Sequence, residues 1–166
     1  MLFARLALEL AGGSFPVIRV LPNTPVSVGE GMVLYTCSPE VSDDELKSFL
    51  SAMSGAGRFS ETEEALIDAG SAISGCGPAF ADMFMEALAD GGVTCGLSRA
   101  KALEYAAQML LGTAKLYLES GKHPGELKDA VCSPGGATIQ GVRVLEERGF
   151  RGAVMDAVIA AYEKEF

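Results

Sequence analysis

The chain has 166 residues, with 13 lysines and arginines against 22 aspartates and glutamates, and its formal net charge is -9. This length can bury a real core in one domain or slightly more, and the negative charge argues against nucleic acids and anionic membranes as partners. No apolar run approaches the roughly 18 residues of a membrane span, and the N-terminus lacks the pattern of a signal peptide.

The cysteines are scattered, with no Cys-x-x-Cys pair, and there is one histidine in the whole sequence. This spacing argues against a zinc site and indicates reduced thiols. We therefore expect a soluble, acidic, cytoplasmic protein that holds no metal.

The first part of the chain predicts an α/β arrangement. Segments rich in β-branched residues predict three strands, at residues 17–21, 31–37 and 57–60. Two helices are expected with them, at residues 2–10 and 42–52. Ser42 is the expected N-cap of the second helix, and Glu45 completes a capping box. The order of these elements predicts the last part of a sheet whose first strands are missing.

After residue 60 the pattern becomes helical. Six helices are predicted over about 105 residues, at 62–73, 78–90, 98–119, 124–131, 138–147 and 152–163. Thr62 is the expected N-cap of the first. The second carries a regular acidic face but is otherwise apolar, so it should be buried on most sides. Such helices, rich in alanine, glycine and methionine, predict packing against a second copy of the chain. We place the domain boundary between residues 61 and 62.

Residues 133–138 (Ser-Pro-Gly-Gly-Ala-Thr) predict an unusual helix start. Ser133 is the expected N-cap and Pro134 the first helical residue. Two glycines then fall in the first turn, where each costs about 1 kcal/mol relative to alanine. Free backbone amides, the helix dipole and the Thr138 hydroxyl would favour a small carboxylate or phosphate there. The alternative is a tight helix–helix contact that requires glycine.

A second glycine-rich helix start lies at residues 74–79 (Ser-Gly-Cys-Gly-Pro-Ala). It resembles a dinucleotide-binding fingerprint superficially, but Phe80 occupies the third glycine position and the preceding segment is helical rather than a strand. A corner between two helices, with Gly77 as cap and Pro78 in the first position, is the simpler interpretation. Two such corners in one bundle favour the hypothesis that both face a ligand.

Five motifs, in order and with matching gaps, resemble the pyrroline-5-carboxylate reductase family: residues 21–25, 63–69, 74–79, 123–129 and 132–139. The likeness covers essentially the whole chain but only the C-terminal part of the family. The family's nucleotide-binding half, with its Gly-x-Gly-x-x-Gly loop, has no counterpart here. Met1 is therefore expected to be a truncation within a longer reading frame.

The resemblance implies a mainly α fold. A helical dimerisation domain of the 6-phosphogluconate dehydrogenase C-terminal-like type would occupy residues 62–166, after a remnant of a Rossmann-type α/β sheet at residues 1–61. It also implies the last step of proline biosynthesis, in which NADPH or NADH reduces the cyclic imine pyrroline-5-carboxylate to L-proline. The enzyme would be a homodimer or a higher oligomer, and this chain alone is expected to lack turnover.

Site residues follow from the same resemblance. The substrate and its carboxylate would be held by Glu64, Ser133, Gly136, Ala137 and Thr138, with Thr138 as the catalytic group that steadies the ring nitrogen. The cofactor would be faced by Asn23, Thr24, Ser74, Gly75, Gly77 and Pro78. A first-turn carboxylate at residue 64 also simply stabilises a helix dipole, and residues 22–25 are simply a good turn. His123 is expected to pack or cap at a helix entrance.

Two other functions are compatible with the sequence. One is a non-catalytic dimerisation or binding module that has lost its nucleotide domain. The other is the helical domain of a nicotinamide-dependent dehydrogenase of β-hydroxyacids, which would use a buried lysine as its acid–base group. Lys101, Lys115 and Lys122 are expected on or beside polar helix faces, so the dehydrogenase hypothesis ranks third, after the reductase and the dimerisation module.

Overall fold

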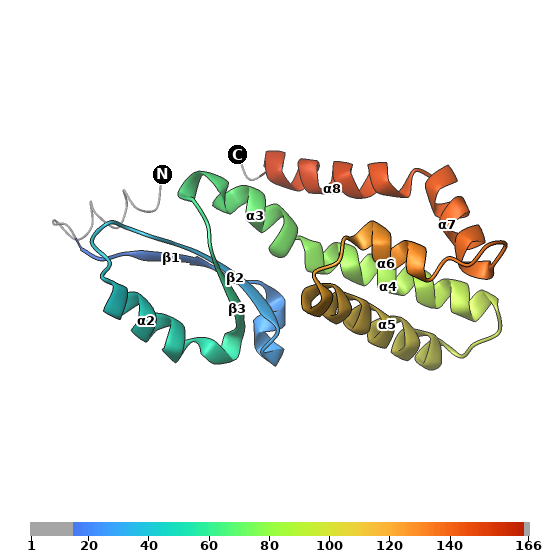
Figure 1. Ribbon diagram of the computed structural model, residues 1–166, viewed down its shortest axis with the longest axis horizontal. Helices are drawn as coiled ribbons and strands as arrows, with labels where there is room; N and C mark the ends of the chain where they lie inside the picture. Colours follow the sequence, from blue (N-terminus) through green and yellow to red (C-terminus); the bar gives the residue numbers. More distant parts are fainter. Residues whose placement is uncertain (1–14, 165–166) are drawn as a thin grey trace. The chain divides into compact units, whose positions relative to one another are not determined.

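The computed structural model describes residues 15–164, which form two compact units (Figure 1). Unit 1 contains residues 15–78 and 157–164 of this range, and unit 2 contains residues 79–156. The helix predicted at residues 2–10 lies outside the described residues. The predicted fold class, a helical domain after the last strands of an α/β sheet, is confirmed. The division after residue 61 stays a prediction.

The sheet of unit 1 has three strands in the order β1-β2-β3: β1 Ile18–Leu21, β2 Gly31–Cys37 and β3 Gly57–Glu61. β1 runs antiparallel to β2, and β3 runs parallel to β2. All three predicted strands are confirmed, β2 with the predicted bounds.

Helices cover both faces of this sheet (Figure 1). On one face, the Phe59 ring of β3 lies 6.0 Å, edge-on, from Phe49 of α2 (Asp43–Ala52), and Tyr35 lies beside it. Leu34 points to the opposite face, because side chains alternate along a strand. There it touches α3 (Ile67–Ser74) so closely that a Cβ atom on Gly70 would lie 2.5 Å from its Cδ1 atom. β2 is therefore the centre of the core.

The N-terminus of α2 has the predicted capping box. The Ser42 N–H donates to Oε2 of Glu45 at 2.9 Å, and the Glu45 N–H donates to the Ser42 hydroxyl oxygen at 3.4 Å. After α2, a short 3-10 helix, η2 (Ser54–Ala56), leads into β3.

Two elements of unit 1 differ from the prediction. The expected turn at residues 22–25 continues as a 3-10 helix, η1 (Thr24–Val28). The helix expected from Thr62 begins instead as a 3-10 turn, η3 (Glu64–Leu66), before α3. The reason is that the Thr62 N–H donates to the Tyr35 carbonyl at 2.9 Å, which holds Thr62 beside β2.

Five helices follow α3, as predicted: α4 Gly77–Thr94, α5 Arg99–Ser120, α6 Pro124–Ala130, α7 Ala137–Glu147 and α8 Phe150–Lys164. The end of α4 packs closely on the start of α5, since a Cβ atom on Gly92 would lie 3.1 Å from that of Ala102. The Phe84 ring of α4 contacts the Phe150 ring of α8, with centroids 5.6 Å apart.

Unit 2 has almost no core of its own. Across residues 79–156, all of which are described, only Ala89, Ala102 and Ala106 are buried. Within one chain α4 is not buried on most sides, since Met83 is 70% exposed, so the expected burial of this helix would require the second copy. Large apolar side chains are exposed on α4, α5, α7 and α8, and a surface of this kind marks an interaction site.

Within residues 15–164, no helix combines the length and the apolar character that crossing a membrane requires. The same range contains no cluster of three or more His, Cys, Asp or Glu side chains that could hold a metal ion.

Candidate functional site

The turn before α7 is shaped by two glycines. Gly135 has a left-handed backbone, with φ +69°, and the Gly136 N–H donates to the Ser133 carbonyl at 3.0 Å. A Cβ atom on Gly136 would lie 2.3 Å from the Ser133 hydroxyl oxygen and 3.1 Å from the Ser133 carbonyl oxygen, so a larger residue there would displace the Ser133 side chain. The predicted cap at Ser133 is wrong. A left-handed residue cannot belong to an α-helical turn, and α7 starts only at Ala137, with Gly136 as its N-cap.

The first turn of α7 has no side-chain cap. Among residues 15–164, no side chain caps this end of the helix, and its N-cap, Gly136, has no side chain to offer. Ala137 and Thr138 are exposed at this end of the helix. Free amides, the positive end of the helix dipole and a hydroxyl are thus gathered at one place, and together they can hold a small anion.

α6 precedes this turn and carries His123 at its start. The Nδ1 atom of His123 accepts a hydrogen bond from the Gly125 N–H at 3.1 Å, so the expected capping role is confirmed. Near the end of α6, Lys128 pairs with Asp129, and this contact raises the pKa of Lys128.

In unit 1, Asn23 lies just after β1 and makes two bonds to the backbone. Its Nδ2 atom donates to the Ser74 carbonyl at 2.9 Å, and its Oδ1 atom accepts from the Met32 N–H at 2.9 Å. The structure thus brings Asn23 and Ser74, two of the predicted cofactor-facing residues, into direct contact. Thr24, another of these predicted residues, begins η1.

Only two residues, Gly75 and Cys76, separate α3 from α4. The N–H groups of both donate to the carbonyl of buried Ser71, at 2.7 and 3.2 Å. α4 then begins at Gly77, one residue earlier than predicted. A Cβ atom on Gly77 would meet nothing within 4 Å, so the backbone here is open to a close approach.

Glu64 takes part in a charged cluster that sequence reasoning missed. Arg19 of β1 lies 3.2 Å from the Asp68 carboxylate and 3.9 Å from that of Glu64. Because opposite charges compensate one another, this half-buried arginine can remain in the protein interior. A signal was present in the sequence, since Arg19 is the one charged residue of the predicted strand at 17–21.

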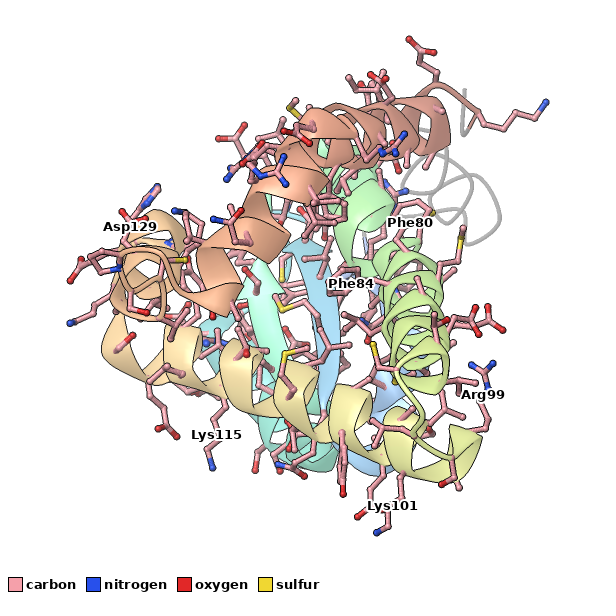
Figure 2. All side chains as sticks on the ribbon, turned by 90° about the vertical axis from the view of Figure 1, so that its right-hand side faces the viewer. Phe80, Phe84, Arg99, Lys101, Lys115 and Asp129 are labelled. Carbon is pink, nitrogen blue, oxygen red and sulfur yellow. The ribbon has the colours of Figure 1, made fainter. Side chains whose placement is uncertain are left out.

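The lysines that a β-hydroxyacid dehydrogenase would need are not buried. The side chains of Lys101, Lys115 and Lys122 are 57%, 72% and 56% exposed. Each lies within 4 Å of a glutamate three or four residues further along the chain. In Figure 2, Lys101 and Lys115 point away from the other helices. These three lysines therefore do not provide the buried acid–base group that the hypothesis of a β-hydroxyacid dehydrogenase domain requires.

The predicted site residues therefore form two groups. Asn23, Thr24, Glu64 and residues 74–78 belong to unit 1, and residues 133–138 belong to unit 2.

Comparison with known proteins gives one consistent result. The family described as pyrroline-5-carboxylate reductase dimerisation matches residues 64–165. Pyrroline-5-carboxylate reductase of Synechocystis sp. is 45% identical over 166 residues, which cover 98% of this chain and 62% of that protein. The Escherichia coli enzyme of the same name is 45% identical over 148 residues, or 89% of this chain and 55% of that protein.

Solved structures agree. A pyrroline-5-carboxylate reductase from Coxiella burnetii superposes with a TM-score of 0.91 at 31% identity, over 97% of this chain and 60% of that one. The Plasmodium falciparum pyrroline carboxylate reductase with NADP bound has a TM-score of 0.86 at 37% identity, over 95% of this chain and 64% of that one. The chain thus spans between 55% and 64% of the length of each protein named here.

Proposed function

Because the chain belongs to the pyrroline-5-carboxylate reductase family, we propose that it is the substrate-binding and dimerising part of an enzyme that reduces pyrroline-5-carboxylate to L-proline. The observation that carries this proposal is the uncapped start of α7 behind Gly136, in a chain that matches reductases along nearly its full length. Turnover belongs to the whole enzyme, and the 166-residue chain by itself is expected to show negligible NADPH oxidation.

The start of α7 is the proposed seat of the substrate carboxylate. The N–H groups of Ala137 and Thr138 donate to it, and the helix dipole stabilises its charge. Gly136 leaves the approach free of a side chain, and the Ser133 hydroxyl beside it is a further donor. The Thr138 hydroxyl accepts the N–H of the protonated ring and so orients the imine carbon. Orientation is the main task, because a protonated imine is already a good hydride acceptor.

Glu64 stands on the substrate side in this proposal. The negative charge of Glu64 favours the protonated form of the imine. Arg19, whose guanidinium lies 3.9 Å from this carboxylate, helps to hold Glu64 in place. The alternative role of the Glu64 carboxylate is structural: it would stabilise the helix dipole at the start of η3 and α3.

NADPH or NADH supplies the hydride when bound. The Ser74–Pro78 turn fits a cofactor, because the backbone at Gly77 has open space beside it. The NADP in the Plasmodium falciparum structure supports a nicotinamide dinucleotide as the ligand class. Thr24, Ser74, Gly75, Gly77 and Pro78 are the proposed cofactor-facing residues, together with Asn23.

Dimerisation completes the proposal. Unit 2 buries three alanines and exposes its large apolar side chains, so most of its apolar surface needs a partner. The dimerisation family matches residues 64–165, which include all of unit 2. A second copy of the chain is the proposed partner.

Calorimetric titration with L-proline tests the carboxylate seat. We expect L-proline to bind, D-proline not to bind, and Thr138→Ala to weaken binding at least about tenfold, because a hydrogen bond to a charged group is lost. Thr94→Ala removes an exposed hydroxyl from the end of α4 and should leave binding unchanged.

Equal binding of both enantiomers contradicts the assigned carboxylate seat, and undiminished binding by Thr138→Ala contradicts the role given to the Thr138 hydroxyl. A native chain that dimerises but binds neither enantiomer favours the alternative function, a dimerisation module without a ligand.

A further inference from the structure

The side-chain amide of Asn23 joins three elements of unit 1. It stands two residues beyond the end of β1, donates to the carbonyl of Ser74 at the end of α3, and accepts from the N–H of Met32 in β2. Both bonds are 2.9 Å long and partly buried. Asn23 and Ser74 are 51 residues apart in the chain, so this contact is made by the fold.

The Ser74 carbonyl has a particular need for this donor. In a continuing helix it would accept from the N–H four residues later, and that residue is Pro78, which has no N–H. A carbonyl left unpaired in a partly buried place destabilises the segment that carries it. Nδ2 of Asn23 therefore stands in for the missing N–H of Pro78.

α3 is tied to the β1 side of the sheet at both ends. Arg19 holds the first turn of α3 through Asp68, and Asn23 holds its last residue, Ser74. Of these two ties, only the one from Asn23 adjoins the turn between α3 and α4. Loosening it should therefore free the turn, while loosening the Asp68 contact should not.

We propose that Asn23 is a positioning residue, whose amide replaces the N–H that Pro78 lacks and thereby fixes the Ser74–Pro78 turn. The consequence for hydride transfer rests on the proposed function, in which this turn faces the cofactor. In this role Asn23 acts on the reaction through Ser74, by the bonds from its amide to the Ser74 carbonyl and the Met32 N–H, in addition to facing the cofactor.

The first test is amide hydrogen exchange in this chain, measured at Gly75 and Cys76. Asn23→Asp keeps the acceptor for Met32 but sets a carboxylate against the Ser74 carbonyl, and Asn23→Ala removes both bonds. Each should speed exchange at both amides at least about fivefold, the factor that one net hydrogen bond represents. Asp68→Asn, at the other end of α3, should not change these two rates.

Rescue is the second test. Pro78→Ala supplies an N–H four residues after Ser74, so adding it to Asn23→Ala should return exchange at Gly75 and Cys76 to within about twofold of the Pro78→Ala rate. Unchanged exchange in both Asn23 variants, or a double variant as fast as Asn23→Ala, overturns the proposal.

Steady-state kinetics of the complete reductase, with its nucleotide-binding half present, test the consequence. Asn23→Asp should raise KM for NADPH at least about fivefold and leave KM for pyrroline-5-carboxylate unchanged, while Asp68→Asn should leave KM for NADPH unchanged. Equal changes in both KM values contradict action through the cofactor-facing turn. A native protein without reductase activity overturns the proposed function instead, and the exchange of Gly75 and Cys76 still decides the role of Asn23.

Discussion

Gly57 lies directly against the backbone of Gly31, its partner in the parallel pair of β2 and β3. A Cβ atom on Gly57 would lie 2.2 Å from the Gly31 carbonyl oxygen and 2.3 Å from its nitrogen. Gly57 also has φ +130°, a backbone conformation that other residues rarely adopt. This contact sets the start of both strands and, with it, the register of the core.

Gly57→Ala should therefore lower the free energy of unfolding by at least about 3 kcal/mol, because backbone strain and a backbone clash act together. Urea unfolding followed by circular dichroism measures this loss. Gly55→Ala is the matched control, since a Cβ atom there meets nothing within 4 Å, and its effect should stay within about 0.5 kcal/mol. Similar stabilities for the two variants would contradict the role given to the Gly31–Gly57 contact.

The capping box of α2 predicts a pH dependence. Hydrogen bonds from Ser42 lower the pKa of Glu45, so the ionised carboxylate stabilises the folded state. This contribution is complete above the ordinary glutamate pKa of about 4.3 and is lost as the pH falls through the lowered native value. Ser42→Ala should thus lose more stability at pH 7 than at pH 3, as measured by urea unfolding at each pH.

Part of the Ser42→Ala effect should persist in acid, because the Ser42 hydroxyl oxygen also accepts from the Glu45 N–H. Ser48→Ala removes a hydroxyl that donates to the Asp44 carbonyl in the same helix, and its effect should not depend on pH in this way. Equal pH dependence in the two variants would show that the carboxylate is not what Ser42 stabilises.

Elements fixed by short-range chemistry could be predicted from the sequence. The bounds of β2 follow from a run of apolar and β-branched residues, and the start of α2 follows from Ser42 and Glu45. The start of η3 could not be predicted, because it depends on a bond from Thr62 to Tyr35, across two strands. Local propensity alone favoured a helix cap at Thr62.

The candidate site shows the same limit. Residues 133–138 were recognisable as a glycine-rich helix start, but the left-handed backbone of Gly135 moves that start to Ala137. Glycine is compatible with either geometry, so the residue type does not choose between them. The Asn23–Ser74 bond was equally hidden, since a turn of Pro, Asn and Thr satisfies local rules without it.

Cys37 should be a slow thiol. Burial, and then the nearby negative charge of Glu61, raise its pKa, so little thiolate is present at neutral pH. Alkylation by iodoacetamide, followed by mass spectrometry, should be slower at Cys37 than at exposed Cys95, and should accelerate as the pH rises. Glu61→Gln removes one cause and should speed the reaction at Cys37 but not at Cys95. An unchanged rate at Cys37 would leave burial as the sole cause.

The exposed apolar side of α5 should be part of the contact between two copies of the chain. Met109 and Leu116 lie on the same side of the helix, two turns apart, and are 44% and 53% exposed, so their replacement should not disturb folding of one chain. Met109→Lys with Leu116→Lys would place two charges in an apolar interface and should weaken self-association at least about a hundredfold. Gln108→Lys adds a charge on the polar side of α5, near Glu104, and should leave the dimer intact. Sedimentation velocity over a range of protein concentrations separates these outcomes, and a dimer that survives the double substitution would place the interface on other helices of unit 2.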